Sequence, residues 1–451
     1  MENKSKTLTI SESLLAYWLS RSDFFRNVLA LMTGTAIAQT IPIAASPILT
    51  RLYAPEDFGV LALYMSVAAI ISVIVTGRYE LAVILPKSDE DAINVAAICI
   101  IIASLVSLVT FIVIWVFNTK ITSLLGNPKI SKWLYFVPLT ISLTGILHVL
   151  ISWCIRKKHF KRLSINKIYG SSSSSAAKIG VGFAGAGETG LITGGILGLI
   201  TATGILGWQV CRNDNIKRKT IKRNKITSLL VRYKNFPKFS IPADFINVIA
   251  NQMPVILFSN FFGAAVVGFY AFTHRILGMP LGLISNSILD VFKQRASSDY
   301  ATYGNCRDIY VKTLKHMLLI SVIPFTLFYF IAPELFAFVF GTQWRQAGEY
   351  AQLLSILFLF RFIASPLSYV LYIAEKQKYD LIWQVFLLIF TFLSILIGVY
   401  LNNAKISLTC FSLSYSAMYL ISLYISYYFA KGNSKYPPKT APERPAGGKT
   451  A

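Results

Sequence analysis

The stretch AINVAAICIIIASLVSLVTFIVIWVF, residues 92–117, runs for 26 positions without a charged side chain. An α-helix rises about 1.5 Å per residue, so about 20 apolar residues cross the roughly 30 Å hydrocarbon core of a bilayer. Only 14% of the whole chain is charged and its mean hydropathy is +0.58, whereas about a quarter of the residues of a soluble domain are charged. The sequence therefore predicts a membrane protein.

Apolar runs of similar length recur along the chain, separated by charged or turn-rich breaks. They predict an all-α polytopic membrane protein with about twelve transmembrane helices in two lobes of six. We expect an interfacial segment at 1–26, a first lobe at 27–211, a basic linker at 212–238, a second lobe at 239–430 and a disordered tail at 431–451. The expected spans cover residues 27–50, 57–79, 92–117, 131–155, 164–184, 189–211, 239–262, 265–290, 311–340, 347–373, 380–401 and 405–430.

The distribution of Lys and Arg predicts which side of the membrane each loop faces. If the N-terminus is cytoplasmic, 33 of the 43 basic residues fall in cytoplasmic segments and 6 fall on the opposite side. Because cytoplasmic loops retain Lys and Arg, this bias predicts that both termini are cytoplasmic. The remaining 4 basic residues, Lys167, Lys178, Arg275 and Arg361, lie inside expected spans.

The net charge of +23 does not indicate nucleic-acid binding, because the charges flank apolar runs instead of forming a patch on a soluble domain. None of the five cysteines is spaced like a metal ligand. We expect no disulfide, no metal and no cofactor.

The most basic gap lies between the sixth and seventh spans and reads KRKTIKRNK, followed by VRYKNFPK. It could bind anionic lipid or phosphate. The more ordinary interpretation is a linker that sets topology, and we favour it.

A faint internal repeat relates the two halves. Residues 37–42, IAQTIP, match residues 249–254, IANQMP, and 58–60, FGV, match 267–269, VGF. In each half the first motif lies in a proline-bearing first helix. The second motif contains a glycine at the start of the second helix. Parallel repeats that handle a substrate between them recur among transporters.

The first helix of each half is also the least apolar. The first carries Gln39 and Thr40, and the seventh carries Asp244, Asn247 and Asn251 at helical spacing with Ser240. A polar stripe on a membrane helix must face protein or water. We expect these residues to line a water-filled cavity; contacts between helices are the alternative.

Basic residues near a bilayer midplane are costly, and by default they indicate function. Arg275 and Arg361, near the middle of their spans, and Lys178, in the outer half of its span, are therefore candidates for an anionic headgroup. The structural alternatives are an ion pair of Arg275 with Asp244 or Asp290, and a cap on helix carbonyls for Arg361. Lys167 lies near the inner surface and is expected to snorkel.

Three other features have structural interpretations as strong as functional ones. His274 could sense protons beside Arg275, although a hydrogen-bonded packing histidine is the commoner case. Arg78 and Glu80 close the second span and could form a gate or a plain interface pair. Gly194 and Gly198 form a GxxxG pattern that favours close helix packing.

The run TRLYAPEDFGVLALYMSV (50–67), followed by GRYELAVILPKSDEDA (77–92), resembles the opening of bacterial polysaccharide flippases. These Wzx-type proteins belong to the multidrug/oligosaccharidyl-lipid/polysaccharide (MOP) exporter superfamily. The turn motif Leu52-Tyr53-x-Pro55-x-Asp57-Phe58-Gly59 and the triplet Arg78-Tyr79-Glu80 carry the resemblance.

The resemblance implies a MATE-like fold of two six-helix bundles in the bacterial inner membrane. It implies an undecaprenyl-pyrophosphate-linked oligosaccharide as cargo, and Arg275, Arg361, Lys178 and Arg78 as the residues that hold the pyrophosphate. Membrane lipids, a polymerase and other glycan-assembly proteins are the implied partners. The coupling energy stays open among H⁺, Na⁺ and the membrane potential.

Two alternatives remain. A multidrug or metabolite cation antiporter of the same superfamily would favour carboxylates over arginines in its cavity. A membrane polysaccharide polymerase or ligase would need a large outer loop with reactive residues, and the expected outer loops are short. We therefore expect a protein that is not an enzyme.

Overall fold

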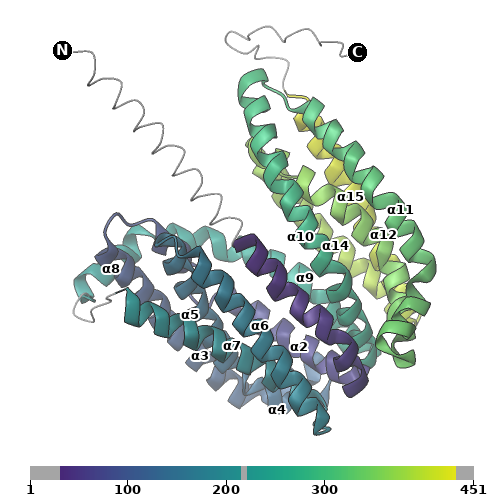
Figure 1. Ribbon diagram of the computed structural model, residues 1–451, viewed down its shortest axis with the longest axis horizontal. Helices are drawn as coiled ribbons and strands as arrows, with labels where there is room; N and C mark the ends of the chain where they lie inside the picture. The colour runs from purple at the N-terminus through teal and green to yellow at the C-terminus, as the bar shows by residue number, and fades with distance from the viewer. Residues whose placement is uncertain (1–30, 215–220, 433–451) are drawn as a thin grey trace, which may run out of the picture. The chain divides into compact units, whose positions relative to one another are not determined.

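The computed structural model describes residues 31–214 and 221–432, and within those ranges the regular structure is entirely helical (Figure 1). The expected segment 1–26 and nearly all of the expected tail 431–451 lie outside the described residues. After a helix over residues 31–52, the longer helices are α2 (Pro55–Ser72), α3 (Asp89–Leu125), α5 (Val137–Arg156), α6 (Phe160–Phe183), α7 (Glu188–Asn213), α8 (Arg223–Arg232), α9 (Ile241–Phe262), α10 (Ala264–Tyr303), α11 (Arg307–Phe340), α12 (Arg345–Leu367), α14 (Gln377–Tyr400) and α15 (Ala404–Ala430). Shorter helical segments are η1 (Tyr79–Ile84), η2 (Pro128–Ile130), α4 (Ser131–Leu134), η4 (Phe236–Ser240), η5 (Thr342–Trp344) and α13 (Val370–Ile373).

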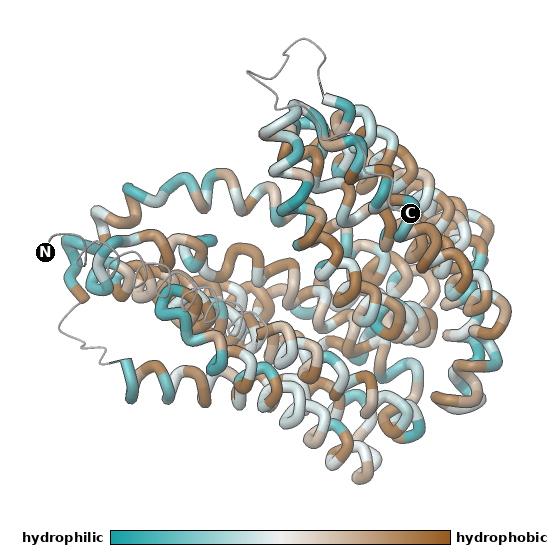
Figure 2. The backbone as a smooth tube through the Cα atoms, turned by 45° about the horizontal axis from the view of Figure 1, so that its top comes forward, coloured by the Kyte–Doolittle hydropathy of each residue, from teal (hydrophilic) through white to brown (hydrophobic). Residues whose placement is uncertain are grey.

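Each of the twelve expected spans coincides with a long helix of the described chain. Over those residues, ten helical segments are long and apolar enough to cross a membrane. The α6 helix is not among the ten, and its sequence contains four basic residues and a run of five serines. Apolar stretches run along the helices while polar residues gather near many of their ends (Figure 2). The protein is thus a multi-pass membrane protein.

Several helix ends differ from the sequence prediction because hydropathy detects only the apolar part of a helix. The α10 helix continues past the expected end at residue 290 to Tyr303, where Gly304 ends it in a left-handed conformation with φ 68°. The second span is shorter than expected. It ends at Ser72, and Gly77 and Arg78 follow with φ 62° and 61°.

The chain divides into two compact units, residues 1–248 and residues 249–451, with the boundary inside α9. Each unit repeats the same set of helix neighbours. In the first unit α3 packs on α5, α5 on α7 and α6 on α7; in the second α11 packs on α12, α12 on α15 and α14 on α15. This shared arrangement supports the internal repeat that the short sequence matches suggested.

The matched motifs occupy equivalent places in the two units. Pro55 opens α2 after a short turn, and Gly263, with φ 86°, precedes α10. The matched glycines Gly59 and Gly268 are both buried, close to the start of these helices. The repeat therefore marks the tight turn between the first two helices of each unit.

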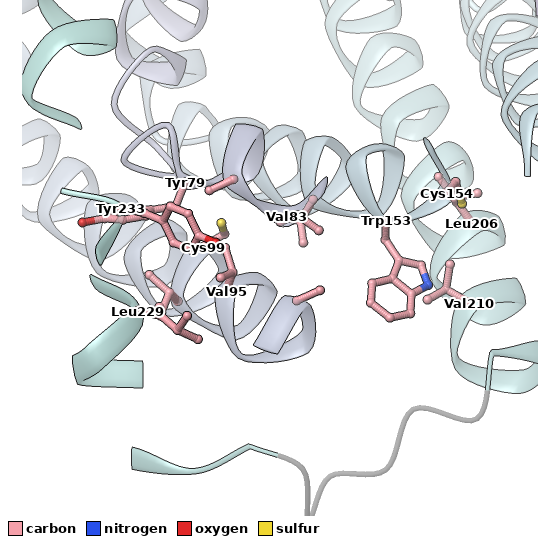
Figure 3. Close-up of a cluster of buried hydrophobic side chains, with 14 of the residues drawn as sticks. Tyr79, Val83, Val95, Cys99, Trp153, Cys154, Leu206, Val210, Leu229 and Tyr233 are labelled. Atoms are coloured by element: carbon pink, nitrogen blue, oxygen red, sulfur yellow. The ribbon is translucent and has the colours of Figure 1, made fainter. Parts of the chain in front are cut away.

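A buried apolar cluster supports the first unit around η1, the start of α3 and the linker. Tyr79, Cys99 and Tyr233 lie close together in it, and Trp153 lies beside Val210 (Figure 3). Leu229 of α8 and Tyr233 are buried members of the cluster. The basic linker therefore contributes a helix that is packed against the ends of the second and third spans.

Candidate functional site

The second unit buries a polar cluster around Arg361 on α12. The Arg361 Nη1 atom lies 3.5 Å from Nε2 of His274 on α10, within hydrogen-bonding distance. Rings surround the pair: His274 lies 5.8 Å from Tyr270 and 5.2 Å from Phe358, measured between ring centroids. Four helices, α9, α10, α12 and α15, supply the side chains of this cluster.

A small cavity opens beside Arg361 and His274. Its lining includes Asn251 and the two tyrosines Tyr270 and Tyr415. Its volume is about 10 Å³, which is room for about one water molecule. In this conformation the cluster is an almost closed, donor-rich pocket with no carboxylate in its lining.

Arg275 follows His274 on α10 but does not join the cavity lining. Within its own unit, among the residues that the structure describes, it makes no ion pair, and Asp290 does not partner it. The sequence allowed Asp244 as the other partner. Asp244 pairs instead with Arg78. Arg275 and Arg361 are thus two cations in membrane helices of the second unit without a carboxylate partner there.

The first unit holds a different polar cluster, centred on Arg78. Its Nη2 lies 2.9 Å from Oδ2 of Asp244, and its Nη1 lies 3.4 Å from Oε1 of Glu80. Glu80 is 4% exposed, and it also accepts a hydrogen bond from Thr76. One guanidinium thus pairs with both acids, and the three side chains together carry a formal charge of −1.

The backbone explains why these charges meet. Gly77 and Arg78 both adopt left-handed φ values, which turns the chain sharply after α2. Arg78 then contacts the start of α9, while the Tyr79 hydroxyl donates to the Leu230 carbonyl of α8 at 3.2 Å. We call residues 77–80 the elbow; it holds both the linker helix and the first helix of the second half.

The other expected cavity residues do not gather at one point. Asn247 lies on the exposed face of α9, in the first unit, whereas Asn251 lines the Arg361 cavity in the second. Gln39 is half-buried in the helix over 31–52. Thr40 is exposed there and donates to the Ala36 carbonyl at 2.9 Å.

Lys178 lies at a close helix contact. A Cβ atom on Gly194 of α7 would lie 2.5 Å from Lys178 Cγ, and the Lys178 carbonyl accepts a 2.5 Å hydrogen bond from Tyr53. Gly198 approaches Ser174 equally closely. The GxxxG pattern thus forms the tight α6–α7 contact that its small residues predicted. Lys167 lies in the same helix, and its Nζ donates to Thr35 Oγ1 at 2.9 Å.

The family-like turn motif is also explained by packing. The buried Tyr53 ring reaches the α6–α7 hairpin, where a Cβ atom on Gly190 would overlap the tyrosine hydroxyl. The Asp57 side chain accepts a hydrogen bond from the Ala54 N–H at 3.0 Å. The motif therefore joins the first turn to the far hairpin of its own unit.

Sequence reasoning missed Tyr270, Tyr415 and Phe358 of the Arg361 cluster. Tyr270 precedes His274 by one helical turn, a spacing that places both on one face and could have indicated the pair. Phe358 precedes Arg361 by three residues on α12, a spacing that also places both on one face. Tyr415 comes from α15, and no local pattern links it to Arg361.

The arrangement of helices in the two units has counterparts among solved membrane proteins. The chain is similar to the solved structure of the lipid II flippase MurJ in an inward closed conformation, with a TM-score of 0.70 and 15% identity over 88% of this chain and 87% of that one. It is also similar to an inward-facing MATE family multidrug resistance transporter of the MOP superfamily, with a TM-score of 0.65 and 12% identity over 88% and 97%. The chain therefore shares the fold of these two solved proteins.

The chain belongs to the polysaccharide biosynthesis protein family, whose model matches residues 48–349. It is 21% identical over 324 residues to the succinoglycan biosynthesis transport protein ExoT of Rhizobium meliloti strain 1021. The alignment covers 71% of this chain and 63% of that protein. The chain thus aligns with less than two thirds of that relative's length.

Proposed function

We propose that this protein is a flippase of the bacterial inner membrane. It moves an undecaprenyl-pyrophosphate-linked oligosaccharide from the cytoplasmic to the periplasmic leaflet by alternating access, for surface polysaccharide biosynthesis. Three observations support a transport role over an enzymatic one: the membrane-spanning helices, membership of the polysaccharide biosynthesis family and the name of the ExoT relative.

The observation that carries this proposal is the pair of arginines in the second unit. Arg275 and Arg361 have no carboxylate partner among the described residues of that unit. A guanidinium offers a planar fork of donors that suits phosphate oxygens. An unpaired cation in a membrane helix is costly unless a ligand or a pathway uses it.

The Arg361 pocket cannot hold a pyrophosphate in this conformation, because it has room for about one water molecule. The proposal therefore requires Tyr270, Tyr415 and their helices to move apart before Arg361 meets the headgroup. Such opening is the kind of change that alternating access provides. The cycle is proposed to need no bound cofactor and to draw on H⁺, Na⁺ or the membrane potential.

The test uses a strain that lacks the protein and is complemented with variants. Arg275→Ala and Arg361→Ala should each reduce surface glycan while the protein remains in the membrane at normal levels. Lys315→Ala, a basic change on α11 outside the Arg361 cluster, is the matched control. Normal glycan in both arginine variants would overturn the headgroup assignment.

Two other functions make different predictions. A cation antiporter needs a free carboxylate, and Asp244 is already paired with Arg78 at 2.9 Å; altered drug susceptibility of the deletion strain would favour it nonetheless. A polymerase or ligase would act after translocation. Accumulation of the lipid-linked oligosaccharide on the cytoplasmic face of the deletion strain would exclude it, and accumulation on the outer face would support it.

A further inference from the structure

The part of the basic linker that the structure describes, residues 221–240, carries charge of one sign. It contains six Lys and Arg residues and no Asp or Glu. Two acids of α3 reach it: Glu90 Oε2 and Asp91 Oδ1 lie 2.9 and 3.1 Å from Lys225 Nζ. Lys222 also lies 3.7 Å from Glu90. Because these two acids offset at most two of the six charges, the linker keeps an excess of four positive charges.

Four cations of the linker have no acid partner. Arg223 and Arg232 of α8, and Lys234 and Lys238 after it, are all exposed. They make no ion pair among the described residues of the chain. A guanidinium or an ammonium in this state has free donors for phosphate oxygens. The linker therefore presents four available cations within one short segment.

Large apolar side chains are exposed among these cations. Val231 is 61% exposed and Phe239 is 63% exposed. Val231 lies two residues from the buried Leu229, which places these two side chains on opposite sides of α8. The outer side of the linker is thus both apolar and basic, which is the composition of helices that lie in the headgroup region of a bilayer. We call the following exposed side chains the linker surface: Arg223, Val231, Arg232, Lys234, Lys238 and Phe239.

The contacts of α8 place it at the depth of the headgroups. The uncharged run of α3 begins at residue 92. The Lys222 N–H donates to Asn94 Oδ1 at 2.9 Å, and Tyr233 lies beside Cys99 (Figure 3). From residue 92 to residue 99 the helix rises about 10 Å. The linker therefore lies alongside the inner end of this apolar run and not beyond it.

The helices that flank the linker indicate the same depth. Phe239 lies two residues before α9, within the segment Phe236–Phe262 that is long and apolar enough to cross a membrane. On the other side, Trp208 near the end of α7 is 59% exposed, and the Arg212 guanidinium lies 5.1 Å from the centroid of its ring. Exposed aromatic side chains beside cations are typical of the membrane interface. Both ends of the linker thus lie at interface level.

These observations favour an anionic phospholipid over a soluble anion. Each Lys or Arg near a negatively charged leaflet strengthens binding about fivefold. Contact with acyl carbons also keeps Val231 and Phe239 from water. Inorganic phosphate offers no such contact, and a soluble acidic protein would have to reach a segment that lies beside the hydrocarbon. A phospholipid meets the charge, the apolar side chains and the depth together.

We propose that the linker surface binds the headgroups of anionic phospholipids in the leaflet predicted to be cytoplasmic. Val231 and Phe239 lie among the first acyl carbons, and the four cations hold the phosphates. The Tyr79 hydroxyl donates to the Leu230 carbonyl of α8, so bound lipid also steadies the elbow. The sequence favoured a linker that only sets topology. The structure adds a binding role, and this role does not depend on the flippase function.

The test is photocrosslinking of the full-length protein in phosphatidylcholine nanodiscs. The probe is a small fraction of phosphatidylglycerol that carries a diazirine in its headgroup, and phosphatidylcholine with the same diazirine is the matched probe. Labelled peptides are mapped by mass spectrometry. Labelling is repeated with excess unlabelled phosphatidylglycerol, with undecaprenyl diphosphate and at raised ionic strength.

Two variants change the linker surface. Arg232→Gln/Lys234→Gln/Lys238→Gln removes three of its cations, and Val231→Glu places an acid among them. The matched control is Arg307→Gln/Lys376→Gln/Lys378→Gln, which removes three exposed cations of the second unit. All substituted side chains are exposed, so the variants should keep the melting temperature of the unchanged protein. If the triple linker variant fails to fold, Val231→Glu decides the test.

We expect the phosphatidylglycerol probe to label residues 221–240, and the phosphatidylcholine probe to label them much less. The triple linker variant should reduce this labelling about tenfold or more and Val231→Glu about fivefold, because each charge contributes about fivefold. The control variant should not reduce it. Unlabelled phosphatidylglycerol should displace the probe, and salt should weaken the labelling because it screens exposed charges.

Equal labelling by the two probes, or labelling that neither linker variant reduces, would overturn the proposal. Displacement by undecaprenyl diphosphate and not by phosphatidylglycerol would also overturn it, and would assign the linker to the diphosphate of the cargo lipid. The flippase proposal can fail separately. Lost labelling in variants that keep full surface glycan would leave the flippase intact, and specific labelling of a protein whose deletion traps no lipid-linked oligosaccharide would leave the phospholipid site intact.

Discussion

The two units have the same helix neighbours but differ in whether their internal arginines are paired with carboxylates. In the first unit Arg78 is matched by Asp244 and Glu80, at 2.9 and 3.4 Å. In the second, Arg361 faces His274 and tyrosines, and Arg275 has no ion pair among the described residues of its unit. Paired charge holds a fold together, whereas unpaired charge is kept at a cost. The comparison motivates the proposal that the second unit meets the anionic ligand.

The largest expected effect comes from removing the unpaired charge. Arg361→Ala should lower transport by about 10- to 100-fold, the loss expected for one or two charge-assisted hydrogen bonds. The measurement is translocation of lipid-linked oligosaccharide in reconstituted vesicles. Arg361→Lys keeps the charge but loses the planar fork, and should retain part of the activity.

Thermal unfolding of the same variant sharpens the comparison. Arg361 has no carboxylate partner among the described residues of its unit, so its removal should leave no buried charge alone, and the melting temperature should not fall. A large drop in melting temperature together with normal transport would make Arg361 a structural residue.

The next effect concerns the hairpin formed by the fifth and sixth helices of each unit. In the first unit Gly190→Ala would place a methyl group on the Tyr53 hydroxyl, and in the second Gly398→Ala would meet the Ser407 backbone. Each should destabilise the protein by about 1–3 kcal/mol, as overpacking does. The measurement is the melting temperature of the purified protein.

The two substitutions should differ in rescue. Adding Tyr53→Phe to Gly190→Ala removes the overlapping hydroxyl and should recover most of the stability. Tyr53→Phe alone should cost about 1 kcal/mol, because it loses the bond to the Lys178 carbonyl. Gly398→Ala meets backbone and should have no such rescue. Failure of the rescue would mean that overlap with the Tyr53 hydroxyl is not what destabilises the Gly190→Ala variant.

A smaller effect is expected from the ion pair of the elbow. Asp244 is 43% exposed and Arg78 20% exposed at the side chain, so solvent screens their interaction. A double-mutant cycle with Arg78→Gln and Asp244→Asn should give a coupling energy of about 1 kcal/mol or less. The Arg78 change alone should cost more, because it leaves Glu80 buried without its cation. Equal costs for the two single changes would contradict this account.

The smallest effect is expected at Lys225 on α8, whose Nζ lies 2.9 Å from Glu90 Oε2 and 3.1 Å from Asp91 Oδ1. Hydrogen bonds to Glu90 and then Asp91 raise the pKa of Lys225. Its contribution is therefore complete below the ordinary lysine pKa of about 10.4 and is lost as pH rises through the raised value.

The mobility of a nitroxide label, attached to a cysteine that replaces Val231, can measure how the Lys225 ion pairs restrain α8. We expect low α8 mobility that is constant near neutral pH and rises only in alkaline solution. Lys225→Gln should give, at every pH, the slightly higher mobility that the unchanged protein reaches only in alkaline solution, because Leu229 and Tyr233 still hold α8. Arg223→Gln, in the same helix, should leave the mobility unchanged. A mobility change near pH 7 would contradict the assignment to Lys225.

The sequence predicted the membrane helices because hydropathy acts over whole spans, and a few misplaced residues do not alter the pattern. The ends at Ser72 and Tyr303 were missed because a left-handed residue such as Arg78 or a polar helical extension leaves no hydropathy signal. The resemblance to polysaccharide flippases was confirmed by the family to which the chain belongs.

Individual site residues were harder to predict. Arg78 and Asp244 were both singled out as polar residues of a membrane protein, but their pairing depends on a backbone turn and on contacts far apart in sequence. Lys178 was selected for its charge, and its place against Gly194 follows from the GxxxG pattern instead. The roles proposed for Arg275 and Arg361 remain predictions for the experiments above.

The boundary of the first unit within α9 has a consequence for biosynthesis. Arg78 and Glu80 are made long before Asp244, and at the usual rate of translation the interval is on the order of ten seconds. During that time the elbow lacks one of its two acids and the α8 helix that Tyr79 holds. An N-terminal fragment ending near residue 211 should therefore be recognised by membrane proteases, whereas one that continues to Val248 should persist.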